Sequence, residues 1–268
     1  NITKRTLTPS SFTASNKVYD GTTTVTGTGF SDDRVGGDVV TFTYTAAFAD
    51  KNVGTGKAVN YTGIAISGGA DAGNYVLSTT TGIANANITA KAITVNADAK
   101  VKVYGTSDPL FTYTYNGLIS GDSFSGELSR AAGENVGTYE IQQNTLTAGS
   151  NYTISYTSAL LEITVKGISV TANTGQSKVY GSVDPTLTYT AVGVVGGDTP
   201  TGNLSRAVGE NVGTYAISIG TLSYGSNYSV TFNGANFEIT AKAITVTADA
   251  QSKTYGDSDP SPLTYVAV

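Results

Sequence analysis

Four residue types are absent from the 268-residue chain: cysteine, methionine, tryptophan and histidine. The absence of cysteine excludes disulfide bridges and removes disulfide chemistry as an obstacle to export, which fits an extracellular location. The absence of both histidine and cysteine removes the side chains that most often act as general base and nucleophile. We therefore expect a protein that is not an enzyme.

Acidic residues could in principle still supply a catalytic pair of carboxylates. The candidates recur, however, because Glu134 and Glu162 return as Glu210 and Glu238 at equivalent places. A catalytic pair is expected once, in one cleft. The recurrence favours a structural role for these acids.

Charge is scarce and mostly negative. Charged residues make up 13% of the chain, and 20 acidic against 15 basic side chains give a formal net charge of −5 and a pI near 4.7. This balance argues against nucleic acid or an anionic membrane surface as partner. No apolar run approaches the roughly 18 residues of a membrane-spanning helix. No signal peptide is visible, and we expect the native N-terminus to lie elsewhere.

What the sequence has in abundance is repetition. The twelve residues 128–139 return at 204–215 with one change and a shift of 76 positions, and Lys-Val-Tyr-Gly at 102–105 returns at 178–181. A relative, Lys-Thr-Tyr-Gly, stands at 253–256. The landmarks of the repeat are Tyr104, Tyr180 and Tyr255 in the tyrosine–glycine motif, and Asn135, Gly137, Asn211 and Gly213 in the longer string.

The leading part of the chain is a relative of these repeats. It carries Tyr19 in Lys-Val-Tyr-Asp-Gly, and its Lys-Asn-Val-Gly at 51–54 corresponds to the Glu-Asn-Val-Gly of the later repeats. A period of 76 residues is the size of a small domain. Cutting at the recurrent Ile-Thr-(x)-Lys phrase predicts residues 1–3 as the tail of a preceding repeat, modules at 4–90, 91–166 and 167–241, and a truncated start of a further module at 242–268.

Within each module, the alternation of apolar and polar residues predicts a succession of short β-strands. Phe111, Tyr113 and Tyr115 alternate with threonines, as a half-buried strand requires. Turn residues such as Gly-Asp and Gly-Ser-Asn separate these runs, and no window shows a sustained 3.6-residue apolar stripe. The sequence predicts an all-β chain of tandem modules with little or no helix. Each module is a small β-sandwich or a β-grasp-like sheet, and the pattern does not separate the two.

The motifs resemble a known family. Lys-Val-Tyr-Gly, a following Asp-Pro and Gly-Glu-Asn-Val-Gly-Thr-Tyr make residues 91–241 similar to tandem MBG domains of the YGX type. Lys-Val-Tyr-Asp-Gly makes residues 4–90 similar to the YDG domain that commonly precedes them. Both domains occur in large secreted or surface proteins of bacteria, including adhesins of the filamentous-haemagglutinin-like kind. The resemblance implies a stalk or presentation role and carries no catalytic residues.

The repeated tyrosines are expected to fill the core. Tyr104, Tyr180 and Tyr255 stand where strand meets turn, and core packing with the hydroxyl bonded to backbone is favoured over ligand stacking. Gly137 and Gly213 are expected to serve a bulge or a close approach of backbone.

No cofactor is expected, and calcium is the alternative to that expectation. Its candidate ligands are Asp98, Asp249, Asp257 and Asp259. No Asp-x-Asp-x-Asp-Gly loop is present, so solvated turn acids are favoured.

The functional prediction is a stalk on the bacterial cell surface, whose repeats have one another as partners. Host or biofilm glycans or proteins would be bound by other regions of the parent protein. The alternative is a set of glycan-binding modules with tyrosine-rich platforms, although alternation places most tyrosines inward.

Overall fold

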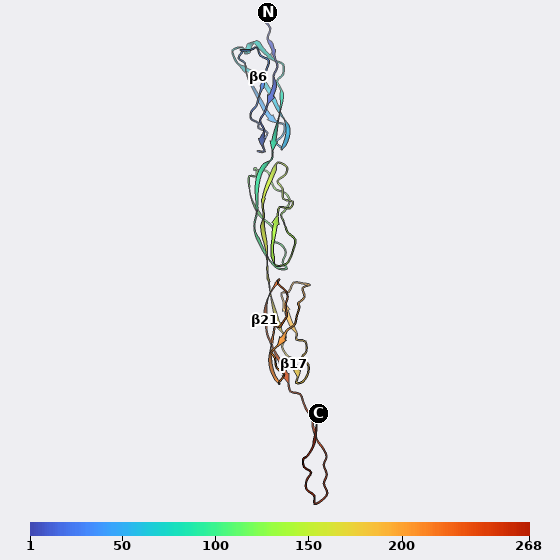
Figure 1. Cartoon of the computed structure of the whole chain (residues 1–268). Coiled ribbons are helices and arrows are strands. Elements are labelled where there is room, and N and C mark those ends of the chain that lie inside the picture. The colour runs from blue at the N-terminus through green and yellow to red at the C-terminus, as the bar shows by residue number, and fades with distance from the viewer. The chain divides into compact units, whose positions relative to one another are not determined.

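The computed structural model describes all residues, 1–268, and is all-β, as the sequence predicts (Figure 1). One 3₁₀ turn, η1 (Ala72–Asn74), is its single helical element. None of its helical structure is long or apolar enough to cross a membrane. The chain divides into two compact units, and each unit contains one junction between consecutive modules. The first junction joins residues 4–90 to 91–166, and the second joins 91–166 to 167–241.

The first module is built around a four-stranded sheet and two strand pairs. Along β8 the buried residues alternate with exposed ones as Ala84, Ala86 and Ile88, which is the apolar-in, polar-out pattern of a one-sided sheet. The sheet has the order β3 (Lys17–Val18), β8 (Gly82–Thr89), β6 (Gly54–Gly68) and β5 (Thr41–Phe48), while β1 (Arg5–Leu7) pairs with β7 (Tyr75–Leu77) and β2 (Ser10–Thr13) with β4 (Gly29–Ser31).

The third module consists of two facing sheets that share one core. Ile168 and Val170 of one sheet and Phe237 of the other lie in a single buried cluster. The module is therefore a β-sandwich rather than a grasp-like sheet. One sheet has the order β17 (Gln176–Val179), β22 (Asn236–Thr240), β20 (Gly213–Ser218) and β19 (Ser205–Arg206), and the other β18 (Tyr189–Val192), β16 (Lys166–Ala172) and β21 (Tyr228–Asn233).

The second module repeats both strand orders. Its parallel pair β9–β14 aligns Lys91 with Tyr152, as β16–β21 aligns Lys166 with Tyr228, so equivalent residues of the two modules share one register position. Its sheets are β10 (Lys100–Val103), β15 (Ala159–Thr164), β13 (Gly137–Gln142) and β12 (Ser129–Arg130), and β11 (Tyr113–Asn116), β9 (Lys91–Ala97) and β14 (Tyr152–Thr157).

Consecutive modules are joined almost directly. Ala90 alone separates β8 from β9, and Val165 alone separates β15 from β16. After the third module, β23 (Val246–Ala248) and β24 (Tyr265–Ala267) pair only with each other. This terminal hairpin is exposed almost throughout and adds no strand to the third module.

Candidate intermodule junction site

Several repeated motif residues meet inside the third module as a network of charges. The Lys178 Nζ atom lies 2.6 Å from Asp184 and 2.5 Å from Glu210, and Arg206 Nε lies 2.7 Å from the same aspartate. Arg206 also pairs with Glu210 at 2.8 Å. The hydrogen bonds from Arg206 and Lys178 lower the pKa of Asp184 to about 2.

Both cations of this network are buried side chains with exposed acidic partners. Arg206 also covers the Tyr215 and Phe237 rings at 5.2 and 5.3 Å from their centroids. In the second module, Lys102 pairs with Glu134 at 2.7 Å. The Lys, Asp, Arg and Glu of these motifs therefore form ion pairs within the second and third modules.

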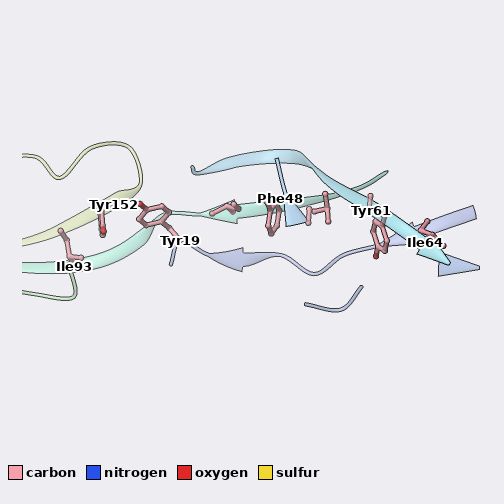
Figure 2. Close-up of a cluster of buried hydrophobic side chains, with 10 residues drawn as sticks. Tyr19, Phe48, Tyr61, Ile64, Ile93 and Tyr152 are labelled. Atoms are coloured by element: carbon pink, nitrogen blue, oxygen red, sulfur yellow. The ribbon is translucent and has the colours of Figure 1, made fainter. Parts of the chain in front are cut away.

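The tyrosine of the tyrosine–glycine motif instead reaches the next module. In the first junction, the Tyr19 hydroxyl donates to the Asp122 carboxylate at 3.0 Å, and Tyr152 donates to the same oxygen at 2.5 Å. The two rings meet edge to face with centroids 5.3 Å apart. Figure 2 shows Tyr19 beside Tyr152 within a cluster that continues through Phe48 to Tyr61. Tyr19 is 1% exposed.

The second junction repeats these contacts. The Tyr104 hydroxyl donates to Asp198 at 3.0 Å, and Tyr228 donates to the same carboxylate oxygen. The rings of Tyr104 and Tyr228 again meet edge to face, at 5.4 Å. Beside them the Val195 amide donates to the Tyr228 hydroxyl at 3.0 Å. Each junction thus holds two phenols on one carboxylate, and we call this arrangement the tyrosine clasp.

The glycine of the motif is required by the clasp. Gly105 has φ +77°, which L-residues rarely adopt, and a Cβ atom there would lie 2.3 Å from the Val195 side chain. Gly21 of the first module has the same φ and would meet Ile119 at 3.3 Å. The chain therefore turns sharply after the tyrosine and lies directly against the next module.

Asparagines form a second connection at each junction. Asn151 Oδ1 accepts the Val53 amide at 2.9 Å, and Asn151 Nδ2 donates to Asn52 at 3.2 Å. At the second junction, Asn227 accepts the Val136 amide at 2.9 Å and donates to Asn135 at 3.0 Å. We call this pair of bonds the asparagine clamp, shared by the Asn-Val and Asn-Tyr motifs.

The first clasp is charged and polarised. The hydrogen bonds from Tyr152 and Tyr19 lower the pKa of Asp122 below its usual range. Burial and the Asp122 hydrogen bond raise the pKa of Tyr152 to about 12. The carboxylate is therefore ionised and the Tyr152 hydroxyl protonated across a wide pH range.

The expectation that the repeated tyrosines fill the core of their own module is wrong. Tyr104 binds Asp198 of the following module, Tyr180 is 49% exposed and Tyr255 is fully exposed. Tyr104 and Tyr180 stand at the exit of their modules, where burial depends on the presence of the next module, while Tyr255 lies in the terminal hairpin. The tyrosine comes directly after a strand that pairs with the closing strand of its module, as β17 pairs with β22.

Gly137 and Gly213 of the longer string both have a positive φ, and Gly213 has no close neighbour. Gly137 and Gly213 have φ +154° and +155°, and nothing lies within 4 Å of a Cβ built at Gly213. The register of β20 and β22 is regular at Gly213, so no bulge occurs there. Both expectations for Gly213 are corrected by this geometry.

The four calcium candidates are not brought together, since no group of three or more acidic side chains could hold a metal ion. Asp98 accepts a hydrogen bond from Thr112 at 2.5 Å, and Asp259 pairs with Lys253 at 2.5 Å. Asp249 and Asp257 lie in the terminal hairpin, where their backbone amides donate to Thr264 and Thr254.

A flat aromatic platform for a sugar is also not formed. Tyr115 is exposed beside Tyr113 and Phe124, but its ring is inclined to theirs by 52° and 65°. Stacking on a sugar face would require coplanar rings, so no observation favours the glycan-binding alternative.

Comparisons with known proteins match the repeats. The MBG domain (YGX type) matches residues 93–162 and again 168–238, and the YDG domain matches residues 3–82. No curated protein matches the chain. Among solved structures, the I67–I69 fragment of the titin I-band is similar over 88% of this chain and 99% of its own, with 9% identity and a TM-score of 0.28. A likeness of that size carries no argument about function.

Proposed function

Because the chain belongs to the MBG domain family of the YGX type, with a YDG domain before two such domains, we propose that it is a stalk segment of a long bacterial surface adhesin. In this role the modules are spacers that project a distal binding region away from the cell. The chain itself carries out no reaction and needs no cofactor. Its partners are its own neighbouring modules, and a host or biofilm receptor is bound elsewhere in the parent protein.

The observation that carries this proposal is the repetition of one junction. Tyr19 and Tyr104 belong to modules of different type, yet each donates to an aspartate of the following module at 3.0 Å. The asparagine clamp is repeated as well. A passive row of domains needs no such contacts, whereas a stalk that resists bending needs them at each joint.

The junctions suit this task physically. A hydrogen bond to a charged acceptor contributes about 1.5–3 kcal/mol, more than a neutral one. Linkers of one residue leave few rotatable bonds between consecutive cores. Clasp, clamp and linker together restrict motion within each unit.

The proposal also agrees with composition. A chain without cysteine or methionine has no thiol or thioether to oxidise outside the cell. The surface is slightly acidic, which discourages adsorption to anionic envelopes. These features support an extracellular location.

Small-angle X-ray scattering of the whole chain tests the proposal. Each module has an expected diameter of about 30 Å. We expect a largest dimension of about 90 Å or more. Because the clasp carboxylates are half-buried, we expect salt to change this dimension little. A compact distribution with a single narrow peak would contradict a spacer role.

The double variant Asp122→Ala, Asp198→Ala removes the acceptor of both clasps in the same experiment. We expect it to broaden the distance distribution as the joints loosen while the modules stay folded. An unchanged distribution would mean that the clasps do not stiffen the chain. A matched variant is Asp257→Ala, which lies in the exposed terminal hairpin and should change nothing.

A further inference from the structure

The exit end of the third module repeats the residues that dock the two earlier modules. Tyr180, Gly181, Asn211 and Val212 correspond to Tyr104, Gly105, Asn135 and Val136 of the second module. We call these four residues the open end.

The backbone of the open end is already in the docking conformation. The Tyr180 amide donates to Thr240 at 2.8 Å, as that of Tyr104 does to Thr164 at 2.9 Å. Gly181 has φ +82°, close to the +77° of Gly105. The two sites therefore have the same backbone conformation, and they differ in whether a following module covers them.

Apolar and polar groups at the open end lack the cover that they have at the other junctions. Tyr180 is 49% and Val212 is 58% exposed. No hydrogen bond holds the Tyr180 hydroxyl or the Asn211 side chain, whereas Tyr104 binds a carboxylate and Asn135 an amide. The open end therefore has the backbone conformation of a docked site and side chains that have no partner.

We propose that the open end binds the N-terminal end of a further complete YGX-type module, one that presents the equivalents of Asp198, Asn227 and Tyr228. The Tyr180 hydroxyl then donates to the aspartate of that module, and its ring meets the tyrosine edge to face. The asparagine accepts the Val212 amide. This inference concerns docking between modules and holds whether or not the chain serves as a stalk.

Two observations identify this occupant. The YDG-type first module and the YGX-type second module differ in sequence, yet both dock on the same aspartate, tyrosine and asparagine positions. These aspartate, tyrosine and asparagine positions form the receiving end of a module, and they accept a preceding module of either type. The open end carries the docking residues in the form found in YGX-type modules.

The terminal hairpin does not supply this receiving end, and a second copy has a free one on its YDG-type first module alone. Residues 242–268 correspond to the module start up to Val192 and contain no equivalent of Asp198, Asn227 or Tyr228. In a second copy, Asp122 and Asp198 are already bound by Tyr19 and Tyr104, and the free receiving end is that of the YDG-type first module, where Tyr75 donates to Asp38 at 2.6 Å. Both receiving ends that are docked in this chain belong to YGX-type modules, which favours such a module as the occupant. An additional module has all three groups free.

The test compares the 268-residue chain with one in which residues 242–268 are replaced by a second copy of residues 166–241. Tyrosine exposure is measured in both by hydroxyl-radical labelling and mass spectrometry. We expect labelling of Tyr180 to fall to the level of Tyr104 in the extended chain and to stay high in the original. Tyr19 is the buried reference in both chains.

A third chain carries Asp198→Ala in the added copy only, and we expect Tyr180 labelling to rise again. Unchanged labelling of Tyr180 in the extended chain overturns the proposal. So does failure of the added copy to acquire amide protection, because the same sequence docks and folds behind the second module. Protection of Tyr180 that rises with concentration in the original chain would assign the surface to a second copy, against the proposal.

Discussion

Tyr19 in the first module and Tyr180 in the third occupy the same place in the Lys-Val-Tyr motif and have opposite surroundings. Tyr19 is enclosed by Phe48 on its own side and Tyr152 on the other, whereas half of Tyr180 faces solvent. The motif alone therefore does not decide burial. The tyrosine is a docking residue, and its contribution to stability depends on the next module along the chain.

The residue after this tyrosine shows how the two domain types reach one geometry. In the first module Asp20 comes before the glycine, and its carboxylate accepts from Lys17 at 2.7 Å and from the Thr22 amide at 2.9 Å. These bonds, led by that from Lys17, lower the pKa of Asp20 to about 2. In the third module the corresponding Lys178 turns to the internal network instead. The lysine partner differs between the two domain types, while the geometry of the clasp is kept.

The largest expected difference comes from removing the two tyrosines. Tyr19→Ala should lower the stability of the first module by about 3–5 kcal/mol, the usual cost of truncating a buried large aromatic. Tyr180→Ala, at an exposed site, should cost less than about 1 kcal/mol. Hydrogen exchange of amides in β8 and β22 measures the two effects separately. Equal losses of stability in the two variants would contradict this prediction and would mean that Tyr180 belongs to the core of its own module.

A smaller effect is expected when the glycine of the motif gains a methyl group. Gly105→Ala combines unfavourable φ with a 2.3 Å clash against Val195, for which about 2–4 kcal/mol is expected. Gly181→Ala has nearly the same φ but nothing within 4 Å, so only the backbone term of about 1 kcal/mol remains. The difference in Tm between the two variants, measured by thermal unfolding, gives the cost of the clash with Val195. Identical shifts in Tm would mean that the Val195 side chain moves away from the added methyl group without a cost in stability.

These matched pairs also show what the sequence can and cannot predict. Alternation along 137–142 and 213–218 is sufficient to predict strands. Sandwich and grasp-like sheets cannot be separated from it, because alternation does not say that β16 pairs with β21 about 60 residues later. The residues that make the charge network are visible as recurrent motifs. Their partners are not, since Lys178 and Glu210 meet only through tertiary folding.

The clasp escapes sequence-based prediction for a related physical reason. A tyrosine between strand and turn has the same local pattern whether it points into its own core or across a junction. Asn227 fits a tight turn by its sequence, and it does lie in one, since the Tyr228 amide donates to Gly225 at 3.3 Å. The second role of its side chain depends on the preceding module and leaves no local signature.

Alkaline pH should distinguish the clasp from an exposed tyrosine. Because the pKa of Tyr152 is raised from 10 to about 12 in the folded chain, its contribution is complete below pH 10. That contribution is lost as pH rises from 10 towards 12, since only the unfolded state ionises readily there. We expect Tm to fall less steeply over this range in Tyr152→Phe than in the parent. Tyr115→Phe, at an exposed ring, should keep the parental slope, and a Tyr152→Phe profile parallel to the parent would contradict the assignment.

The smallest expected effect concerns the asparagine clamp. Asn227→Ala removes the acceptor of the Val136 amide and the donor to Asn135, at a cost of about 1 kcal/mol. Exchange of the Val136 amide should become roughly fivefold faster, which is that free energy expressed as a ratio. Asn227→Asp keeps an acceptor for Val136 but loses the donor to Asn135, so its effect should lie between that of Asn227→Ala and the parent. Asn211→Ala, at the open end, removes the counterpart of Asn135 and should leave exchange of the Val136 amide unchanged; an acceleration equal to that of Asn227→Ala would mean that exchange at Val136 follows the stability of the third module rather than the junction.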